Sequence, residues 1–322
     1  MASEETLSRN RSHRLAASPA TVHTGYYDNS LRPVLTVDSG DVVSIETMML
    51  MDGQMQPSMT AEEIANLRLG YYARGLSTHT LTGPIYVNGA EPGDVLEIRI
   101  LELVPYPFGV NYSMPGSTGS GTLPDEFHDG YARGFEWAPE AKEVEFRPDV
   151  RLPLRPFMGI MAVAPGAAGQ VNTVSPGPYG GNMDLKELVE GTTLYLPVFV
   201  PGALFSTGDA HALQGDGEVS TTALETSMKE ARFQFLVRKD MKLERPMAET
   251  PTHWITMGFH PDLDEAARIA LRDAIEWLVR NKGLSREEAY SLCSLAVDLR
   301  VTQLVDKDKG IHAMIPKAIF KE

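Results

Sequence analysis

The chain has 322 residues, of which 43% are hydrophobic and 22% are charged, and its formal net charge is −14. This composition is typical of a globular protein, and the absence of basic clusters and of long apolar runs speaks against nucleic-acid binding and against a membrane span. The acidity favours a small-molecule or cation partner. Cys293 is the single cysteine, so an intrachain disulfide is excluded and a reducing compartment is expected.

The first part of the chain is dominated by strand patterns. Residues 1–20 are polar and lack an apolar segment, which predicts a disordered N-terminal lead and not a secretory signal. VLTVDSGDVVSIE (34–46) and IYVNGAEPGDVLEIRI (85–100) each contain two alternating apolar segments around a Gly-Asp-Val turn. Two such strand–turn–strand units indicate a β-sandwich or barrel. We therefore expect a β-rich domain over residues 21–200.

Two segments interrupt these strand patterns. Thr60 and Glu63 have the spacing of a capping box, which predicts a short helix after Thr60. The five methionines of residues 48–59 are interpreted as core filler, with an adaptable pocket lining as the alternative. Residues 105–145 are rich in glycine, proline and aromatic residues, which predicts a loop that acts as a lid or shapes the substrate site.

The C-terminal part changes from strand to helix patterns. Apolar residues recur at helical spacing between residues 262 and 282, at Ala267, Leu271, Ala274, Ile275 and Leu278. Asp262 or Asp264 can cap this helix and Gly283 suits its end. Ser285 and Glu288 form a second capping box, before an apolar face at Ala289, Leu292, Ala296 and Leu299. We therefore predict an α+β fold, predominantly β, with sandwich or barrel elements and a C-terminal αα pair within an α+β part over residues 201–322.

The segment GDAHALQGDGEVSTTALET (208–226) concentrates acids, a histidine and glycines. Asp209 and His211 are two residues apart, so on a strand they share one face. Gly215 and Gly217 allow a tight turn, after which the chain returns with Glu218. A hairpin would place Glu218 beside Asp209 and His211, in a register that the sequence leaves open.

A carboxylate and an imidazole at this spacing are suitable ligands for a divalent metal such as zinc. His79 is the candidate for a third ligand, and Glu218 is the candidate for moving a proton from an activated water to a leaving amine. Calcium is the alternative metal, held by Asp209, Asp216 and Glu218. The competing structural interpretation makes Asp209 and His211 part of an ordinary turn, Asp216 a turn aspartate and Glu225 the partner of a basic residue.

The sequence contains no clear candidate for the nucleophile of a covalent mechanism. Cys293 lies in the middle of the predicted second C-terminal helix, where we expect a buried and inert thiol. No G-x-S-x-G motif is present, so a nucleophile elbow is also excluded.

Four blocks of the sequence resemble the acetamidase/formamidase family: HTLTGPIYVNGAEPGDVLEIRILEL, GGNMDLKELVEGTTLYLPVFVPGALFSTGDAHALQGDGEV, ITMGFHPDLDEAARIALRDAI and VTQLVDKDKGIHAMIPKAIF. The resemblance covers most of residues 79–320. It implies hydrolysis of a short carboxamide to carboxylate and ammonia, a β-rich fold with a mixed C-terminal part, a cytoplasmic location and a homo-oligomer. The family's functional positions map onto His79, Asn182, Asp184, Asp209, His211 and Glu218.

Residues 180–184 (GGNMD) fit such a site. The two glycines let the backbone approach a ligand closely, and Asn182 offers the donor and acceptor that a primary amide requires. Asp184 binds metal, holds the leaving nitrogen, or caps a helix formed by DLKELVEG. Where family members commonly carry a cysteine, this chain has Ser220, which favours metal-activated water over a thiol nucleophile.

The leading hypothesis is an amidohydrolase for a small carboxamide substrate, with no nucleic-acid or membrane partner. In it, His79, Asp209 and His211 hold the metal, most simply zinc, and Glu218, Asp184 and Asn182 act in catalysis. One alternative is a non-catalytic protein that binds small amides or calcium on the same scaffold. A second alternative is a hydrolase for a bulkier or cyclic amide or carbamate.

Overall fold

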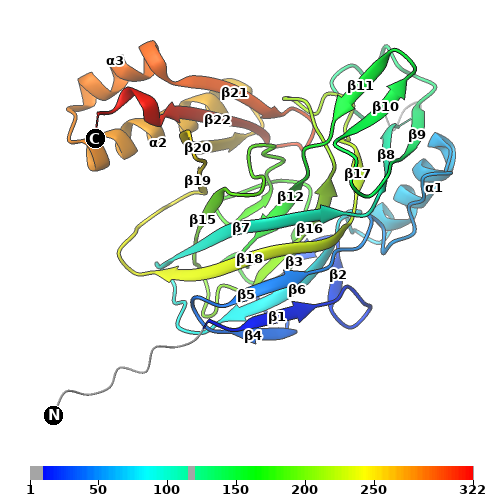
Figure 1. The fold of residues 1–322 in the computed structure, drawn as a ribbon, viewed down its shortest axis with the longest axis horizontal. Helices are drawn as coiled ribbons and strands as arrows, with labels where there is room; N and C mark the ends of the chain where they lie inside the picture. Colours follow the sequence, from blue (N-terminus) through cyan, green and yellow to red (C-terminus); the bar gives the residue numbers. More distant parts are fainter. Residues whose placement is uncertain (1–9, 115–119, 322) are drawn as a thin grey trace.

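The structure is a computed structural model that describes residues 10–114 and 120–321. Two large β-sheets pack against each other, and three α-helices lie at the periphery of the described part of the chain (Figure 1). The predicted α+β fold, predominantly β, is confirmed. Within the described ranges, no helix combines the length and the hydrophobicity that a bilayer crossing requires.

The first sheet has nine strands and is antiparallel except where β1 pairs with β5. Its strands, in spatial order, are β1 (Ser12–Leu15), β5 (Val42–Ile45), β18 (Met228–Arg238), β7 (Val95–Pro105), β15 (Thr193–Pro197), β19 (Met247–Glu249), β20 (His253–His260), β22 (Lys309–Pro316) and β21 (Asp298–Gln303). β7 and β18 are the long central pair, visible across the middle of Figure 1.

The second sheet also has nine strands and branches at β16. Its main path is β14 (Gly180–Asn182), β12 (Phe157–Ala162), β16 (Phe205–His211), β17 (Glu225–Thr226), β8 (Phe108–Ser113) and β9 (Tyr131–Glu136). β16 also pairs with β6 (Thr80–Val87), which carries β2 (Val22–Thr24) and β4 (Leu35–Val37). Two small ribbons join β10 (Glu143–Arg147) to β11 (Val150–Pro153), and β3 (Tyr26–Tyr27) to β13 (Val171–Asn172).

The two predicted strand–turn–strand units are present, and each connects the two sheets. β4 and β6 lie in the second sheet, whereas the strands that follow them, β5 and β7, lie in the first. Both turns have the same internal bond, because Asp41 Oδ2 accepts from the Asp38 amide at 3.0 Å and Asp94 Oδ2 accepts from the Glu91 amide at 3.0 Å. The repeated Gly-Asp-Val segment is thus a corner of the sandwich.

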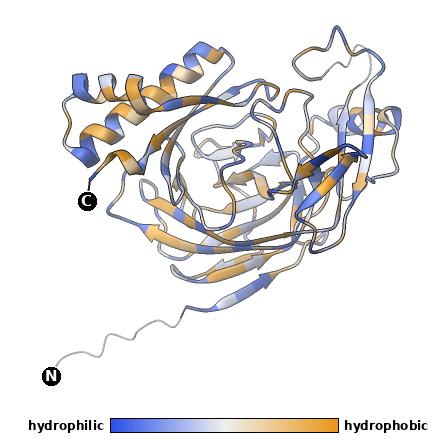
Figure 2. Cartoon of the chain, turned by 45° about the horizontal axis from the view of Figure 1, so that its top comes forward, coloured by the Kyte–Doolittle hydropathy of each residue, from blue (hydrophilic) through white to orange (hydrophobic). Residues whose placement is uncertain are grey.

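The main core lies between the two sheets. It combines Ile98 and Phe233 of the first sheet with Met161 and Phe205 of the second, and all four side chains are fully buried. The Phe205 ring contacts those of Phe233 and Phe235 edge to face, with centroids 6.0 and 5.0 Å apart, a favoured aromatic geometry. Figure 2 shows hydrophobic and hydrophilic residues alternating along the strands, as a two-faced sheet requires.

The helices begin where their caps predict. α1 (Ala61–Tyr72) has the Thr60–Glu63 capping box, and α3 (Arg286–Ala296) has the Ser285–Glu288 capping box. α2 (Leu263–Lys282) is capped by Asp262 and ends at Gly283. A Cβ at Gly258 of β20 would clash with the backbone of α2, so this glycine allows helix and sheet to pack closely. The predicted αα pair therefore covers the β20–β22 end of the first sheet (Figure 1).

The structure differs from several sequence-based expectations. Within the predicted disordered lead, Ser12–Leu15 form β1, because they add a parallel strand to the edge strand β5. The predicted division near residue 200 does not separate two bodies, since β16 and β18 lie inside the sheets formed by earlier strands. Leu299 belongs to β21 and is 43% exposed, so it does not continue the face of α3.

Two further expectations concern the segments between strands. The methionine-rich segment is core filler, because Met49, Met51 and Met55 pack with Ile64 and Tyr71 of α1. The expected loop at 105–145 contains the strands β8 and β9 and the start of β10, and Ser120 and Gly121 within it line the central cavity. Residues 115–119 lie outside the described residues.

Candidate active site

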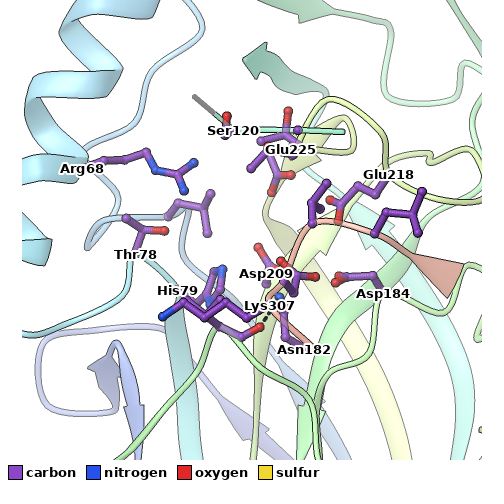
Figure 3. Close-up of a pocket in the computed structure, with 18 of the residues that line it drawn as sticks. Arg68, Thr78, His79, Ser120, Asn182, Asp184, Asp209, Glu218, Glu225 and Lys307 are labelled. Atoms are coloured by element: carbon purple, nitrogen blue, oxygen red, sulfur yellow. Dashed lines mark hydrogen bonds between the residues drawn. The ribbon is translucent and has the colours of Figure 1, made fainter. Parts of the chain in front are cut away.

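A cavity of about 570 Å³ opens where β16 and β17, α1 and the β21–β22 connection meet. Five carboxylates line it, and each is at most 8% exposed: Asp184, Asp209, Glu218, Glu225 and Asp306. Figure 3 shows four of them, Asp184, Asp209, Glu218 and Glu225, on one side of this cavity. Such a concentration of buried acid is costly unless a cation or bound protons balance it.

Asp209 occupies an irregular position in β16. Its φ is 54°, in the left-handed region that side chains rarely adopt, and it lies opposite Gly159 of β12. A Cβ at Gly159 would come within 2.8 Å of Asp209 Oδ2 and 2.6 Å of Asp184 Oδ1. The glycine thereby leaves the space in which these two carboxylates converge.

His211 is the centre of the acidic cluster. Its Nε2 lies 3.5 Å from Asp209 Oδ2 and 3.4 Å from Glu225 Oε2. Its Nδ1 lies 3.1 Å from Gln214 Oε1, while Gln214 Nε2 donates to the Asp184 carbonyl oxygen at 2.9 Å. Because the amide oxygen of Gln214 can only accept, Nδ1 carries the hydrogen and Nε2 is directed at the two carboxylates.

The returning strand pairs with β16 in a register that favours Glu225. β17 runs antiparallel to β16, with Glu225 opposite His211. Glu218 precedes this pairing, at φ 47° in an irregular segment, yet its carboxylate still reaches the cluster. Glu225 pairs with a basic residue, as one interpretation of the sequence had it: that residue is His211, whose Nε2 lies 3.4 Å away, and Glu225 also accepts from the Ala223 amide.

Asp184, Glu218 and Asp306 form the other side of the cluster. Asp184 has φ 50° and both of its carboxylate oxygens are buried without a hydrogen-bond partner among the described residues. The segment after it forms turns, so Asp184 does not cap a helix. Asp306 comes from the connection between β21 and β22 and also buries an unpartnered oxygen. Three acids of the site have a left-handed backbone conformation: Asp184, Asp209 and Glu218. This conformation is strained for residues other than glycine, and such strain is typical of functional sites.

Burial and mutual repulsion shift the pKa values of these acids. Burial raises the pKa of Asp184 and of Glu218 well above the ordinary value, and the neighbouring acids raise both further. Burial likewise raises the pKa of Asp306 to about 7. In the metal-free protein these three groups therefore retain protons far above the pH at which an exposed carboxyl loses its own.

The groups around His211 Nε2 behave differently. Burial opposes ionisation of Asp209, but the charges of His79 and His211 outweigh it and lower its pKa to about 2. Burial also opposes the charge on His211, yet Glu225 and Asp209 outweigh it and raise its pKa well above the ordinary value. The two carboxylates thus favour the protonated form of the His211 ring, whose Nε2 is directed at both of them.

His79 and Asn182 line the same cavity. His79 Nδ1 lies 3.0 Å from Thr173 Oγ1, and burial lowers its pKa, which keeps the ring neutral. Asn182 Nδ2 donates to the Val174 carbonyl at 3.1 Å, which leaves its buried Oδ1 without a partner among the described residues. Asn182 therefore presents an acceptor to the cavity.

The residues of this cluster fit a divalent metal. Asp209, His211 and Glu225 have ligand atoms within 4.8 Å of one another, and so do Asp184, His211 and Glu218. The unpartnered oxygens of Asp184 and Glu225 are carboxylates without the hydrogen bonds that buried polar groups normally make. His79 stands outside both triplets, although it lies near enough to Asp209 for that carboxylate to counteract part of the fall in its pKa.

Three residues singled out in the sequence lie elsewhere. Asp216 pairs with Arg300 at 2.6 Å and with Lys186 at 3.0 Å, so it is not available as a calcium ligand beside Asp209. Ser220 lines a separate, smaller cavity of about 230 Å³. Cys293 is buried in α3, as predicted, and burial raises the pKa of its thiol.

Comparison with known proteins shows which family the chain resembles. The sequence matches the profile of the Acetamidase/Formamidase family over residues 9–170 and 166–322. It is 26% identical to the formamidase of Methylophilus methylotrophus, over 93% of this chain and 89% of that protein. Its match to the acetamidase of Mycolicibacterium smegmatis, at 27% identity, covers 58% of this chain and spans little more than half, 58%, of that protein.

A solved structure agrees over nearly the whole chain. The crystal structure of an acetamidase from Bacillus halodurans superposes with a TM-score of 0.86 at 32% identity, covering 95% of this chain and 98% of that one. The chain therefore belongs to the acetamidase/formamidase family.

Proposed function

We propose that this protein hydrolyses small linear carboxamides in a reaction that requires a divalent metal. The observation that carries the proposal is the buried acid–imidazole cluster, with unpartnered carboxylate oxygens, on the wall of the 570 Å³ cavity. Family membership and the names of the acetamidase and formamidase relatives support it. In the balanced reaction the amide C–N bond breaks, a C–O bond to water forms, and the water proton leaves with ammonia.

The chain offers a coherent ligand set for the metal. Asp209 and His211 Nε2 are its centre, Glu225 joins them, and neutral His79 is the further nitrogen ligand. Imidazole and carboxylate together favour zinc, and calcium is the alternative that so many oxygens allow. When bound, the metal supplies Lewis acidity toward a water molecule and the amide carbonyl.

The remaining polar groups have roles that follow from their protonation. Burial and the neighbouring acids raise the pKa of Glu218, which suits a carboxyl that exchanges a proton with water and with the leaving nitrogen. Asn182 Oδ1 is an unpartnered acceptor, which suits the N–H groups of a primary amide. Asp184 lies beside Glu218 in the cluster and is the second acceptor for that nitrogen.

A combined metal and ammonia assay tests the proposal. The purified protein is analysed for bound metals, treated with a chelator, and assayed for ammonia from formamide, acetamide, benzamide and a lactam before and after adding zinc or calcium. We expect activity on a linear amide that is lost on chelation and restored by one metal. Full activity without metal would contradict the metal requirement, and calcium-dependent thermal stabilisation without ammonia would favour a binding protein.

Single substitutions test the residues. We expect Glu218→Gln to lower kcat by about 10²- to 10⁴-fold, the usual contribution of general acid–base catalysis. His211→Ala should remove both the bound metal and the turnover. The matched control is His128→Ala, because His128 is exposed and outside the cavity. Wild-type turnover by His211→Ala would exclude this histidine from the mechanism.

We also propose that the protein is a cytoplasmic homo-oligomer, as family membership led us to expect. Three exposed apolar side chains support self-association: Leu123, Phe127 and Val219, at 51, 63 and 59% exposure. Light scattering of the purified protein tests it, and a mass of one chain would contradict it.

A further inference from the structure

We propose that Arg68 binds a carboxylate at the far end of the substrate, so that the preferred substrates are monoamides of short dicarboxylic acids. This inference rests on the proposed amide hydrolysis and specifies its acyl group. Arg68 lies on α1 and lines the cavity. Figure 3 shows its guanidinium extending into the cavity from the side opposite Asp184 and Glu218.

Two tyrosines hold the Arg68 side chain in place. Its Nη1 donates to Tyr112 Oη at 2.7 Å, and its Nη2 and Nε donate to Tyr72 Oη at 2.6 and 3.1 Å. The guanidinium carbon lies 5.5 Å from the Tyr112 ring centre and 5.6 Å from that of Tyr72. Tyr112 is itself only 1% exposed, so the guanidinium is oriented before a substrate arrives.

These contacts leave the cation without a counter-ion. Within residues 10–114 and 120–321, no carboxylate forms an ion pair with Arg68, whereas Arg155 and Arg300 each pair with Glu187. A guanidinium has five N–H groups, and the tyrosines accept from three. One N–H group on each terminal nitrogen therefore remains available to a carboxylate, which guanidinium groups bind through strong charge-assisted hydrogen bonds.

The distribution of charge in the cavity gives the substrate an orientation. Arg68 attracts a free carboxylate to the side of the cavity that lies opposite Asp184 and Glu218 (Figure 3). Lys307 also lines the cavity, while Lys309 Nζ is bound to the Pro261 carbonyl at 2.9 Å. An amide with a distal carboxylate would therefore place its charged end at Arg68 and its amide at Asp209 and Glu218. The volume of about 570 Å³ exceeds what formamide or acetamide occupies and leaves room for such a chain.

Matched pairs of substrates test this inference. Malonamic, succinamic and glutaramic acids are compared with propionamide, butyramide and pentanamide, which replace the carboxylate by a methyl group at the same chain length. For the chain length that fits, we expect kcat/KM to be about 10- to 100-fold higher for the acid, the range given by one charge-assisted hydrogen-bonded pair. Ammonia release with the metal-loaded protein is the readout.

Variants of α1 separate recognition from stability. Arg68→Met should reduce the ratio of kcat/KM between acid and methyl partner to near one, and Arg68→Lys should restore part of it. Arg74→Met is the control, because Arg74 follows the same helix and stacks on Tyr71 at 4.2 Å but does not line the cavity. It should keep the wild-type ratio. Thermal unfolding of each variant reports any structural role of Arg68.

The possible results are distinguishable. An acid preference that disappears in Arg68→Met but not in Arg74→Met supports the inference. Hydrolysis of the neutral amides without an acid preference would overturn it and leave the proposed function standing. An acid preference that survives in Arg68→Met, whatever its stability, would also overturn it. No ammonia from either member of any pair would overturn both the inference and the proposed function.

Discussion

Gly159 faces Asp209 across the β12–β16 pair, and a Cβ on this glycine would come within 2.8 Å of the Asp209 carboxylate. The same added atom would come within 2.6 Å of Asp184 Oδ1. The distance between two acids of the cluster therefore depends on a residue that carries no functional group.

Gly159→Ala should displace Asp209 and Asp184 from each other. We expect about 1–3 kcal/mol of lost stability, as for an overpacked core, and a metal affinity reduced by about 10- to 100-fold, as when groups that orient ligands are changed. Metal titration and urea unfolding measure these effects. Gly215→Ala is the control, since its added Cβ meets no atom within 4 Å, and equal metal affinity in the two variants would contradict the argument.

Gln214 determines which nitrogen of His211 faces the carboxylates, because its Oε1 lies 3.1 Å from Nδ1. Gln214→Leu should free the ring to turn and lower metal affinity by about 10- to 100-fold. The measurement is a competition titration with a chromophoric chelator. Gln234→Leu removes a glutamine that bonds Gly40 far from the cavity and should bind metal as the wild type does. An unchanged affinity in Gln214→Leu would show that the tautomer is fixed by other means.

The metal-free protein should lose stability as Asp306 ionises. Its folded pKa of about 7 exceeds the ordinary value of 3.8, so between these values the folded state binds more protons than the unfolded state, and stability falls as pH rises. Asp306→Asn removes this loss. From pH 5 to pH 8, its stability relative to wild type should rise by about 2–3 kcal/mol.

Subtracting the unfolding free energy of wild type from that of Asp306→Asn cancels the contributions of the other titrating groups. His23 and His312 have pKa values lowered to about 4 by burial, and their contribution changes with pH in the opposite direction. Urea unfolding of the chelated proteins at both pH values gives the result. Asp125→Asn, at an exposed carboxylate, should show no such trend. A constant difference between Asp306→Asn and wild type would place the Asp306 carboxylate outside the acidic cluster.

Ser220→Ala tests whether a side chain at this position attacks the substrate. Ser220 lines the smaller cavity and not the one that contains Asp209, so we expect amide turnover within about twofold of wild type, as for a substitution away from the reacting groups. Initial rates of ammonia release measure it. A loss of a hundredfold or more would indicate that Ser220 takes part in the reaction.

Local sequence signals predicted the elements well and the assembly of the site less well. The caps at Thr60, Asp262 and Ser285 are short-range signals, and each begins a helix in the structure. The return of the chain after Gly217 was also predicted, but Glu225 and not Glu218 lies opposite His211. Positive φ at Glu218 and Thr221 makes the intervening segment irregular. The alternation of residue types therefore does not predict which residue after this segment lies opposite His211.

No local sequence pattern predicted that Asp306 and Arg68 would line the cavity. Asp306 lies in VDKDKG, a pattern typical of an exposed turn, yet it is 8% exposed because the β21–β22 connection closes over the cavity. Arg68 lies among the polar residues of α1, and its role depends on Tyr112 of β8, 44 residues further along the chain. Both depend on tertiary packing.

The β21–β22 connection that carries Asp306 follows every other acid of the cluster in the sequence. On the ribosome, β12, β16 and β17 are therefore made before this wall of the cavity exists. A chain truncated before β21 would therefore retain Asp184, Asp209 and Glu218 but lack the wall of the cavity that Asp306 belongs to.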